Sequence, residues 1–197
     1  MYLFSLLYGI FAALGALALQ LALDAVLPFD LLAPLALKAT TPLVATLSLL
    51  LLALTEEALK AAAVAAGIQS TTALHRMYLH ALFVGGGFTL VEWALIALVP
   101  YDTNPFATGA FLGDVIIHLC SPLVIALLFN ALRTWSAAAR ILSTLLIVTL
   151  LHTSYNILAY AGYAPTSAPQ LLFLGAFLGG TLYAMAVAVL HALHTAR

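Results

Sequence analysis

Apolar residues run along the chain in long stretches that are separated by short polar breaks. A helix needs about 20 apolar residues to cross a bilayer, and six stretches are long enough: approximately 2–23, 41–67, 77–99, 108–132, 141–162 and 170–193. The breaks, such as PYDTNPFAT, are rich in Pro, Asp and Asn, which favour turns. Because an open strand leaves its backbone unpaired in lipid, each stretch is predicted to be a helix.

The pattern therefore predicts an all-α polytopic membrane protein. We expect residues 1–197 to form a single transmembrane domain, a bundle of about six transmembrane helices. Composition agrees, since 65% of the residues are apolar and 7% are charged, whereas a soluble domain carries about 25% charged residues. A net charge of −1 gives no basic patch, so nucleic acid is excluded as a partner. The single Cys120 excludes an internal disulfide and a Cys-rich metal site.

The charged residues between the spans predict the orientation of the bundle. Cations follow the second, fourth and sixth spans, at Arg76, Arg133, Arg140 and Arg197. Carboxylates lie on the opposite side, at Asp24, Asp30 and Asp102, and Lys38 departs from this trend. By the positive-inside rule both termini are predicted to be cytoplasmic, which agrees with an even number of spans.

Several ionisable residues fall inside the predicted spans rather than between them. They are Glu56, Glu57 and Lys60 in the second span, Glu92 in the third, Asp114 and His118 in the fourth and His152 in the fifth, where Asn156 follows one turn later. A charge at the centre of a membrane helix costs about 2.5–3.5 kcal/mol on insertion scales. These groups are therefore expected to face one another or a water-filled cavity, and they are candidates for a functional site.

The spacing of these residues favours a shared site. Lys60 lies four residues after Glu56 and three after Glu57, so it can reach either carboxylate. Adjacent residues differ by about 100° around a helix, so we expect one glutamate to face the site and the other to pair with Lys60 or a neighbouring helix. A rise of about 1.5 Å per residue places the polar residues of four helices, within 41–162, in one layer about 10 Å thick.

Structural roles are the alternative explanation for some of these features. The Glu56–Lys60 pair can act only as a salt bridge that fixes helix packing, and Asn156 can simply bond a neighbouring helix. Gly85 to Gly87 fit close helix contact. His80 lies near a helix end, and we expect it at the membrane interface.

Four motifs follow one another along successive spans. EExxK covers Glu56 to Lys60, a glycine-rich GxGFxxxE-like segment covers Gly85 to Glu92, a single His118 follows, and HxxxN covers His152 to Asn156. In this order they resemble the PrsW family of intramembrane proteases, which is related to the CAAX-processing and bacteriocin-immunity membrane endopeptidases. The resemblance covers about residues 50–160, and the first and last spans are generic.

The resemblance implies an endopeptidase that cleaves a membrane-anchored protein or peptide, such as an anti-sigma factor, within the bilayer. We expect the chain in a prokaryotic cytoplasmic (inner) membrane, with lipid and substrate as its partners. From the residues, we predict that Glu57 or Glu56, together with Glu92, holds and deprotonates a water. Lys60 keeps one carboxylate charged, and His118 orients the water or the carboxylate. His152 and Asn156 donate to the oxyanion, and the resemblance implies the same glutamate–water arrangement.

Other chemistries remain open at the level of sequence. Two His and one carboxylate form a familiar zinc set, which His118 and His152 can complete with Glu92 or Glu57. We favour chemistry without a cofactor, because the chain has no HExxH motif. A transporter or proton relay also buries such groups, but repeat symmetry between the halves is not evident. A non-catalytic scaffold would keep the bundle and is expected to lose one of the four motifs.

Overall fold

Five helices make up the described part of the protein. The computed structural model describes residues 2–32, 41–68, 74–98 and 110–162. Its helices are α1 (Tyr2–Val26), α2 (Pro42–Ile68), α3 (Leu74–Ala97), α4 (Ala110–Ala131) and α5 (Ala137–Gly162). No strand occurs in these ranges, so the all-α prediction is confirmed for them. The predicted sixth span at 170–193 and the C-terminus lie outside the described residues.

Local sequence explains where two of the helices begin. Pro42 is the first residue of α2, where its missing N–H costs nothing, and Thr41 Oγ1 accepts a hydrogen bond from Val44 N at 3.4 Å. Ser136 Oγ accepts from Ala139 N at 3.3 Å and caps the start of α5. The short connection between α4 and α5 therefore reverses the chain and starts the next helix at once.

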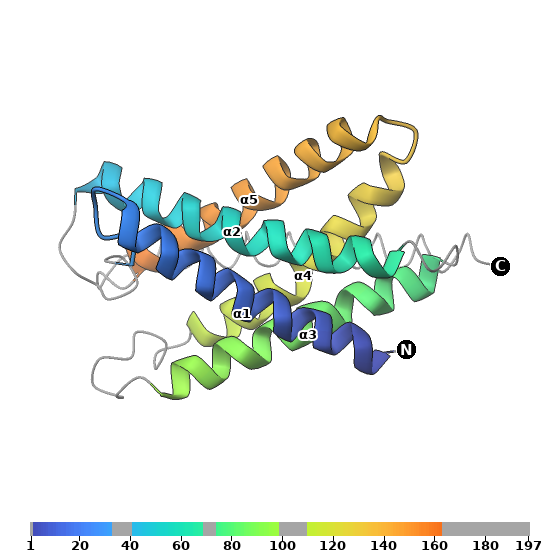
Figure 1. Ribbon diagram of the computed structural model, residues 1–197, viewed down its shortest axis with the longest axis horizontal. Coiled ribbons are helices and arrows are strands. Elements are labelled where there is room, and N and C mark those ends of the chain that lie inside the picture. The colour runs from blue at the N-terminus through green and yellow to red at the C-terminus, as the bar shows by residue number, and fades with distance from the viewer. Residues whose placement is uncertain (1, 33–40, 69–73, 99–109, 163–197) are drawn as a thin grey trace.

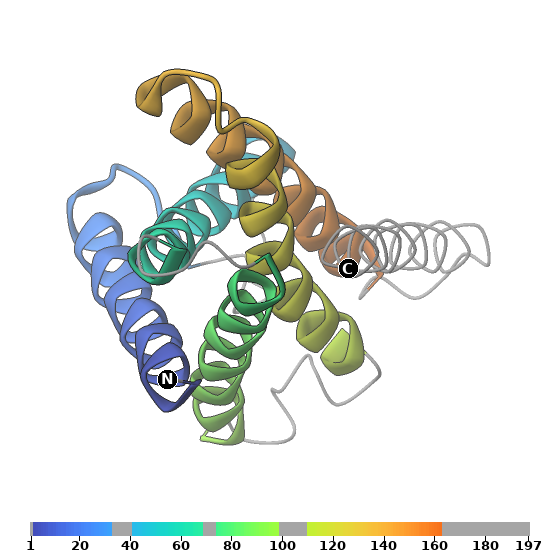
Figure 2. The same cartoon turned by 90° about the vertical axis from the view of Figure 1, so that its right-hand side faces the viewer.

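The chain runs back and forth along the long axis of the bundle, and consecutive helices point in opposite directions (Figure 1). The start of α1, the end of α2, the start of α3 and the α4–α5 connection all lie at one end. Seen along the bundle, α3 packs between α1 and α4 (Figure 2). Helix α2 contacts the other four described helices, so polar residues at its middle can meet partners from all of them.

Apolar side chains cover the outside of this bundle. Four helices, α1, α2, α3 and α5, are long and apolar enough to cross a membrane, while α4 has a shorter apolar part at Val115–Ala131. Phe4, Phe11 and Leu142 are each more than 60% exposed, whereas Glu57 and Lys60 are fully buried. A protein surrounded by water would show the reverse distribution. The arrangement is typical of helices that face lipid.

Glycines allow α1 and α3 to pack with their backbones in contact. A Cβ atom added at Gly87 would collide with the carbonyl oxygen of Leu6, and one added at Gly9 would collide with that of Val84. By contrast, a Cβ at Gly86 would meet only a side-chain methyl of Leu6, at 3.9 Å. Two neighbouring glycines of one motif therefore differ sharply in the space around them.

We expect Gly87→Ala to lower the thermal stability of the protein and Gly86→Ala to leave it unchanged or raise it. Alanine favours a helix by about 1 kcal/mol over glycine at both positions. At position 87 the added methyl forces two backbones apart, and such overpacking costs about 1–3 kcal/mol. Thermal unfolding of both variants in detergent tests this, and equal stabilities would contradict the close packing of α1 on α3.

Hydrogen bonds of His80 link three helices in the interior of the bundle. His80 on α3 is buried, at 4% exposure, rather than facing the membrane interface as predicted. Its Nε2 lies 3.1 Å from the Ala63 carbonyl of α2 and its Nδ1 lies 2.7 Å from Ser5 Oγ of α1. Because a carbonyl only accepts, Nε2 donates to Ala63 and the Ser5 hydroxyl donates to Nδ1. The interfacial prediction was wrong because it ignored partners on other helices.

Candidate functional site

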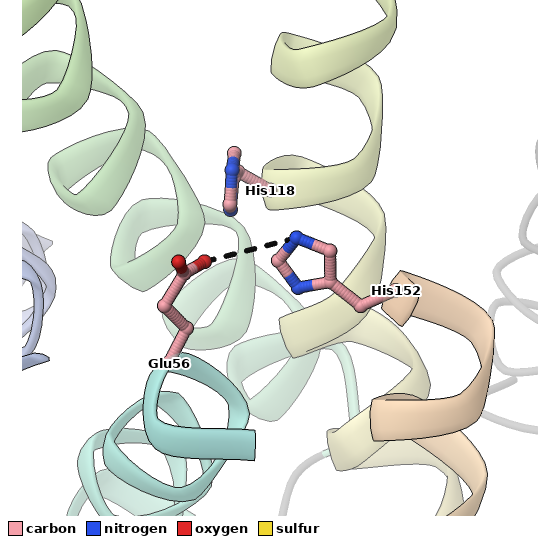
Figure 3. A group of neighbouring side chains, drawn as sticks. All are labelled: Glu56, His118 and His152. Carbon is pink, nitrogen blue, oxygen red and sulfur yellow. Dashed lines mark ion pairs between the residues drawn. The ribbon is translucent and has the colours of Figure 1, made fainter. Parts of the chain in front are cut away.

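Four helices bring six ionisable side chains together in the interior of the bundle. The group, here called the polar cluster, consists of Glu56, Glu57 and Lys60 of α2, Glu92 of α3, His118 of α4 and His152 of α5. Figure 3 shows three of them pointing toward one another from their separate helices. The convergence expected from the sequence is therefore present in the fold.

The Glu57–Lys60 pair forms the buried base of the cluster. Lys60 Nζ donates to Glu57 Oε1 at 2.9 Å, and both side chains are completely buried. The same Glu57 oxygen lies 2.7 Å from His152 Nδ1. A buried charge needs a partner of opposite sign, so Glu57 and Lys60 neutralise each other while Glu57 also orients His152.

His118 has both ring nitrogens occupied. Lys60 Nζ lies 2.6 Å from His118 Nδ1, and an ammonium can only donate, so Nδ1 accepts. Nε2 then carries the proton in the neutral ring, and it lies 2.7 Å from Glu92 Oε2. Phe88 stacks on the imidazole with ring centroids 5.2 Å apart, and Lys60 Nζ lies 4.1 Å from the Phe88 centroid. These contacts fix the ring in place and define its tautomer.

His152 takes the opposite tautomer. Its Nδ1 faces a carboxylate oxygen of Glu57, which accepts, so Nδ1 carries the proton. In the neutral ring Nε2 then keeps its lone pair, and it points toward Glu56 Oε2 at 3.7 Å, the contact dashed in Figure 3. Glu57 and Glu56, which are adjacent on α2, thus face the Nδ1 and the Nε2 of the same His152 ring.

The approach of α3 to α4 depends on Gly85 and Pro122. A Cβ at Gly85 would lie 2.5 Å from the carbonyl oxygen of His118. Pro122 lies inside α4 and has no N–H, so that carbonyl lacks its usual helical donor four residues later. Gly85 on α3 and Pro122 on α4 therefore allow the two helix backbones to approach closely beside His118.

Glu56 is held from one side by a residue that the sequence did not single out. Gln20 Nε2 of α1 lies 3.1 Å from Glu56 Oε1. Among the described residues, no hydrogen bond reaches the buried Glu56 Oε2. The first span is therefore not generic, and the sequence signal for this contact was a single amide among apolar neighbours.

Two members of the cluster are partly exposed. The Glu56 and Glu92 side chains are 14% and 22% exposed, while those of Glu57, Lys60, His118 and His152 are exposed by 2% or less. Three carboxylates share one ammonium, so this part of the site has a formal charge of −2 when both imidazoles are neutral.

Among the described residues, the three side chains whose ligand atoms lie close enough together to share a metal ion are not the predicted zinc set. Glu56, His118 and His152 each offer one ligand atom, and these atoms lie within 4.8 Å of one another. In the structure Glu92 and Glu57 instead contact the two imidazoles. A metal bound at His118 Nδ1 would have to displace the Lys60 ammonium, whereas a metal bound at Nε2 would replace the proton between the ring and the Glu92 carboxylate.

Asn156 lies one turn after His152 on α5 and is half-buried. Within the described residues, none of the hydrogen bonds connects it to the polar cluster. Its predicted role as an oxyanion donor remains a prediction.

Comparison of the chain with protein-family models, with curated proteins and with solved structures finds no match. The resemblance to the PrsW family therefore rests on the four motifs alone.

Proposed function

We propose that the chain is an integral membrane endopeptidase that hydrolyses peptide bonds of membrane-associated proteins with a water activated by Glu56. One observation carries the proposal: Glu56 Oε2 and His152 Nε2, both acceptors in their basic forms, face each other across 3.7 Å. A hydrogen on the imidazole, on the carboxyl group or on a bridging water would relieve the repulsion between the two lone pairs. A water donates to both when it lies about 2.8 Å from each atom, and this spacing permits it.

The chemical step follows from this arrangement. Glu56 takes a proton from the water, and the oxygen of the resulting hydroxide forms a bond to the peptide carbonyl carbon while the C=O π electrons move to the carbonyl oxygen, which becomes an oxyanion. The C–N bond then breaks, and the proton held by Glu56 passes to the departing amine. Glu57 holds the Nδ1 proton of His152 in place, so only Nε2 of that ring faces the reaction.

Two further groups supply the oxyanion with donors. In the neutral ring Nε2 of His152 accepts from the water, so it donates to the oxyanion only where the ring has taken up a second proton from solvent; the carboxamide of Asn156, one turn further along α5, is the neutral donor of the pair. Donors aimed at the developing oxyanion are commonly the largest single contribution to such a reaction. Glu92 and His118 form the opposite wall, where the Nε2–H of His118 keeps the Glu92 carboxylate oriented.

The partly exposed side chains suggest how the substrate approaches. Glu56 and Glu92 are the exposed members of the cluster, so an extended peptide is expected to enter beside α2 and α3. The apolar exterior favours a substrate that is itself anchored in the membrane. In keeping with the charge distribution, we propose a prokaryotic cytoplasmic membrane with both termini inside.

The reaction is tested with purified protein in liposomes that contain membrane-anchored reporter peptides. Cleavage in water labelled with heavy oxygen should place one labelled oxygen in the new C-terminal carboxyl group, which mass spectrometry detects. The absence of any product from a broad reporter set would contradict the proposal and favour a scaffold or a proton relay.

A zinc-dependent protease is the second candidate, because Glu56, His118 and His152 offer three donors within 4.8 Å. We expect activity to persist after chelation, since the Lys60 ammonium already neutralises part of the cluster and occupies His118 Nδ1. The measurement is turnover alongside the metal content of the same sample. Activity that disappears with chelation and returns with stoichiometric zinc would establish the metalloprotease instead.

A further inference from the structure

We propose that Gln20 of α1 is a positioning residue of the site. By holding Oε1 of Glu56, it directs the other carboxylate oxygen, Oε2, toward His152. The inference rests on the proposed function, because it assigns a partner to the residue that activates the water. Gln20 is buried, at 7% exposure, in a helix whose other buried residues are alanine, glycine and serine.

The orientation of the Gln20 amide follows from its neighbours. Its Nε2 lies 3.1 Å from Glu56 Oε1, 3.1 Å from Thr55 Oγ1 and 3.4 Å from the Leu52 carbonyl oxygen. The Thr55 hydroxyl already donates to Leu52 O at 2.8 Å, so it accepts from Gln20. All three neighbours are acceptors, and only the NH₂ group can face them.

The two carboxylate oxygens of Glu56 consequently differ. Oε1 is held by Gln20, and Oε2 faces His152 Nε2 at 3.7 Å and Lys60 Nζ at the same distance. A carboxylate at the end of a flexible side chain gains in reactivity when one oxygen is anchored and the other is aimed. Gln20 provides that anchor from a different helix, while Thr55 and Leu52 fix Gln20 itself.

Two variants of nearly equal shape separate positioning from packing. Gln20→Leu removes the donors, and we expect kcat to fall about 10- to 100-fold with little change in KM, the effect of losing one hydrogen bond to a charged group. Gln20→Glu places a carboxylate against Glu56 and should lose more at neutral pH. At lower pH a protonated Glu at position 20 donates as the amide did, so its kcat relative to wild type should recover.

Two controls accompany these variants. Leu19→Ala alters an exposed side chain next to Gln20 on the same helix and should retain wild-type kcat. Thr55→Val removes the second acceptor of Gln20 together with the hydrogen bond from Thr55 to Leu52 O, but leaves the Gln20–Glu56 contact, and should reduce kcat less than Gln20→Leu does. Wild-type kcat in folded Gln20→Leu, or a loss in Gln20→Glu that does not depend on pH, would overturn the inference.

An infrared measurement keeps the inference testable without activity. The carboxylate stretching band of Glu56 is identified by its loss in Glu56→Gln, and it should shift in Gln20→Leu because one oxygen loses its donor. An unchanged band would refute the role of Gln20. Failure of the wild type to cleave any reporter would count against the proposed function instead, so the two failures are distinguishable.

Discussion

Glu56→Gln is expected to lower kcat by about 100- to 10,000-fold, the usual contribution of a positioned general base. Glutamine has nearly the same shape, so its carbonyl oxygen can still accept from Gln20. Its NH₂ group then takes the place of Oε2 and can donate to His152 Nε2, so a donor faces an acceptor where two acceptors lay 3.7 Å apart. The variant should therefore fold normally, yet it has no group that takes a proton from water.

The measurement is single-turnover cleavage of a membrane-anchored reporter, with thermal unfolding of the same sample as a check on folding. Ser154→Ala is a suitable control, because Ser154 lies on α5 near His152, is exposed and bonds only to the Leu150 carbonyl of its own helix. That variant should cleave at the wild-type rate. If Glu56→Gln also kept a rate within about threefold of wild type, the general base would have to be another residue.

The convergence of the polar cluster was predictable because buried charges in apolar helices must find one another. Lys60 and Glu57 lie on one helix, and their contact follows from a spacing of three residues. Residues on separate helices, such as Glu92 and His118, were expected to meet only from their similar depth. The five described helices likewise follow the apolar stretches to within a few residues, because lipid-spanning length and turn residues define both.

The roles within the cluster were not accessible from sequence, because they depend on contacts between distant residues. Gln20 and Glu56 are separated by 36 positions, and a single amide in an apolar helix gives no indication of its partner. Nor does a sequence specify which ring nitrogen of a histidine faces which carboxylate. The opposite tautomers of His118 and His152 arise only after Lys60 and Glu57 have been placed beside them.

Lys60→Met is expected to destabilise the protein by about 3–5 kcal/mol, the cost of leaving one member of a buried ion pair without its partner. Methionine fills similar space but carries no charge. Glu57 would keep only His152 as a donor, and His118 Nδ1 would lose the hydrogen bond that sets its tautomer. Thermal unfolding in detergent measures the effect, and Arg76→Met, which removes an exposed cation from the start of α3, should shift stability by no more than about 0.5 kcal/mol.

The double variant Lys60→Met with Glu57→Gln distinguishes charge balance from packing. Removing both charges eliminates the uncompensated carboxylate, so at least half of the lost stability should return, since a neutral pair can replace a buried ion pair at little cost. Cleavage should not return with it, because His152 loses the carboxylate that holds its Nδ1 proton. If the double variant were as unstable as Lys60→Met alone, the loss would not come from the uncompensated charge of Glu57, and the ammonium would not be the cation that lets three carboxylates lie together inside the bundle.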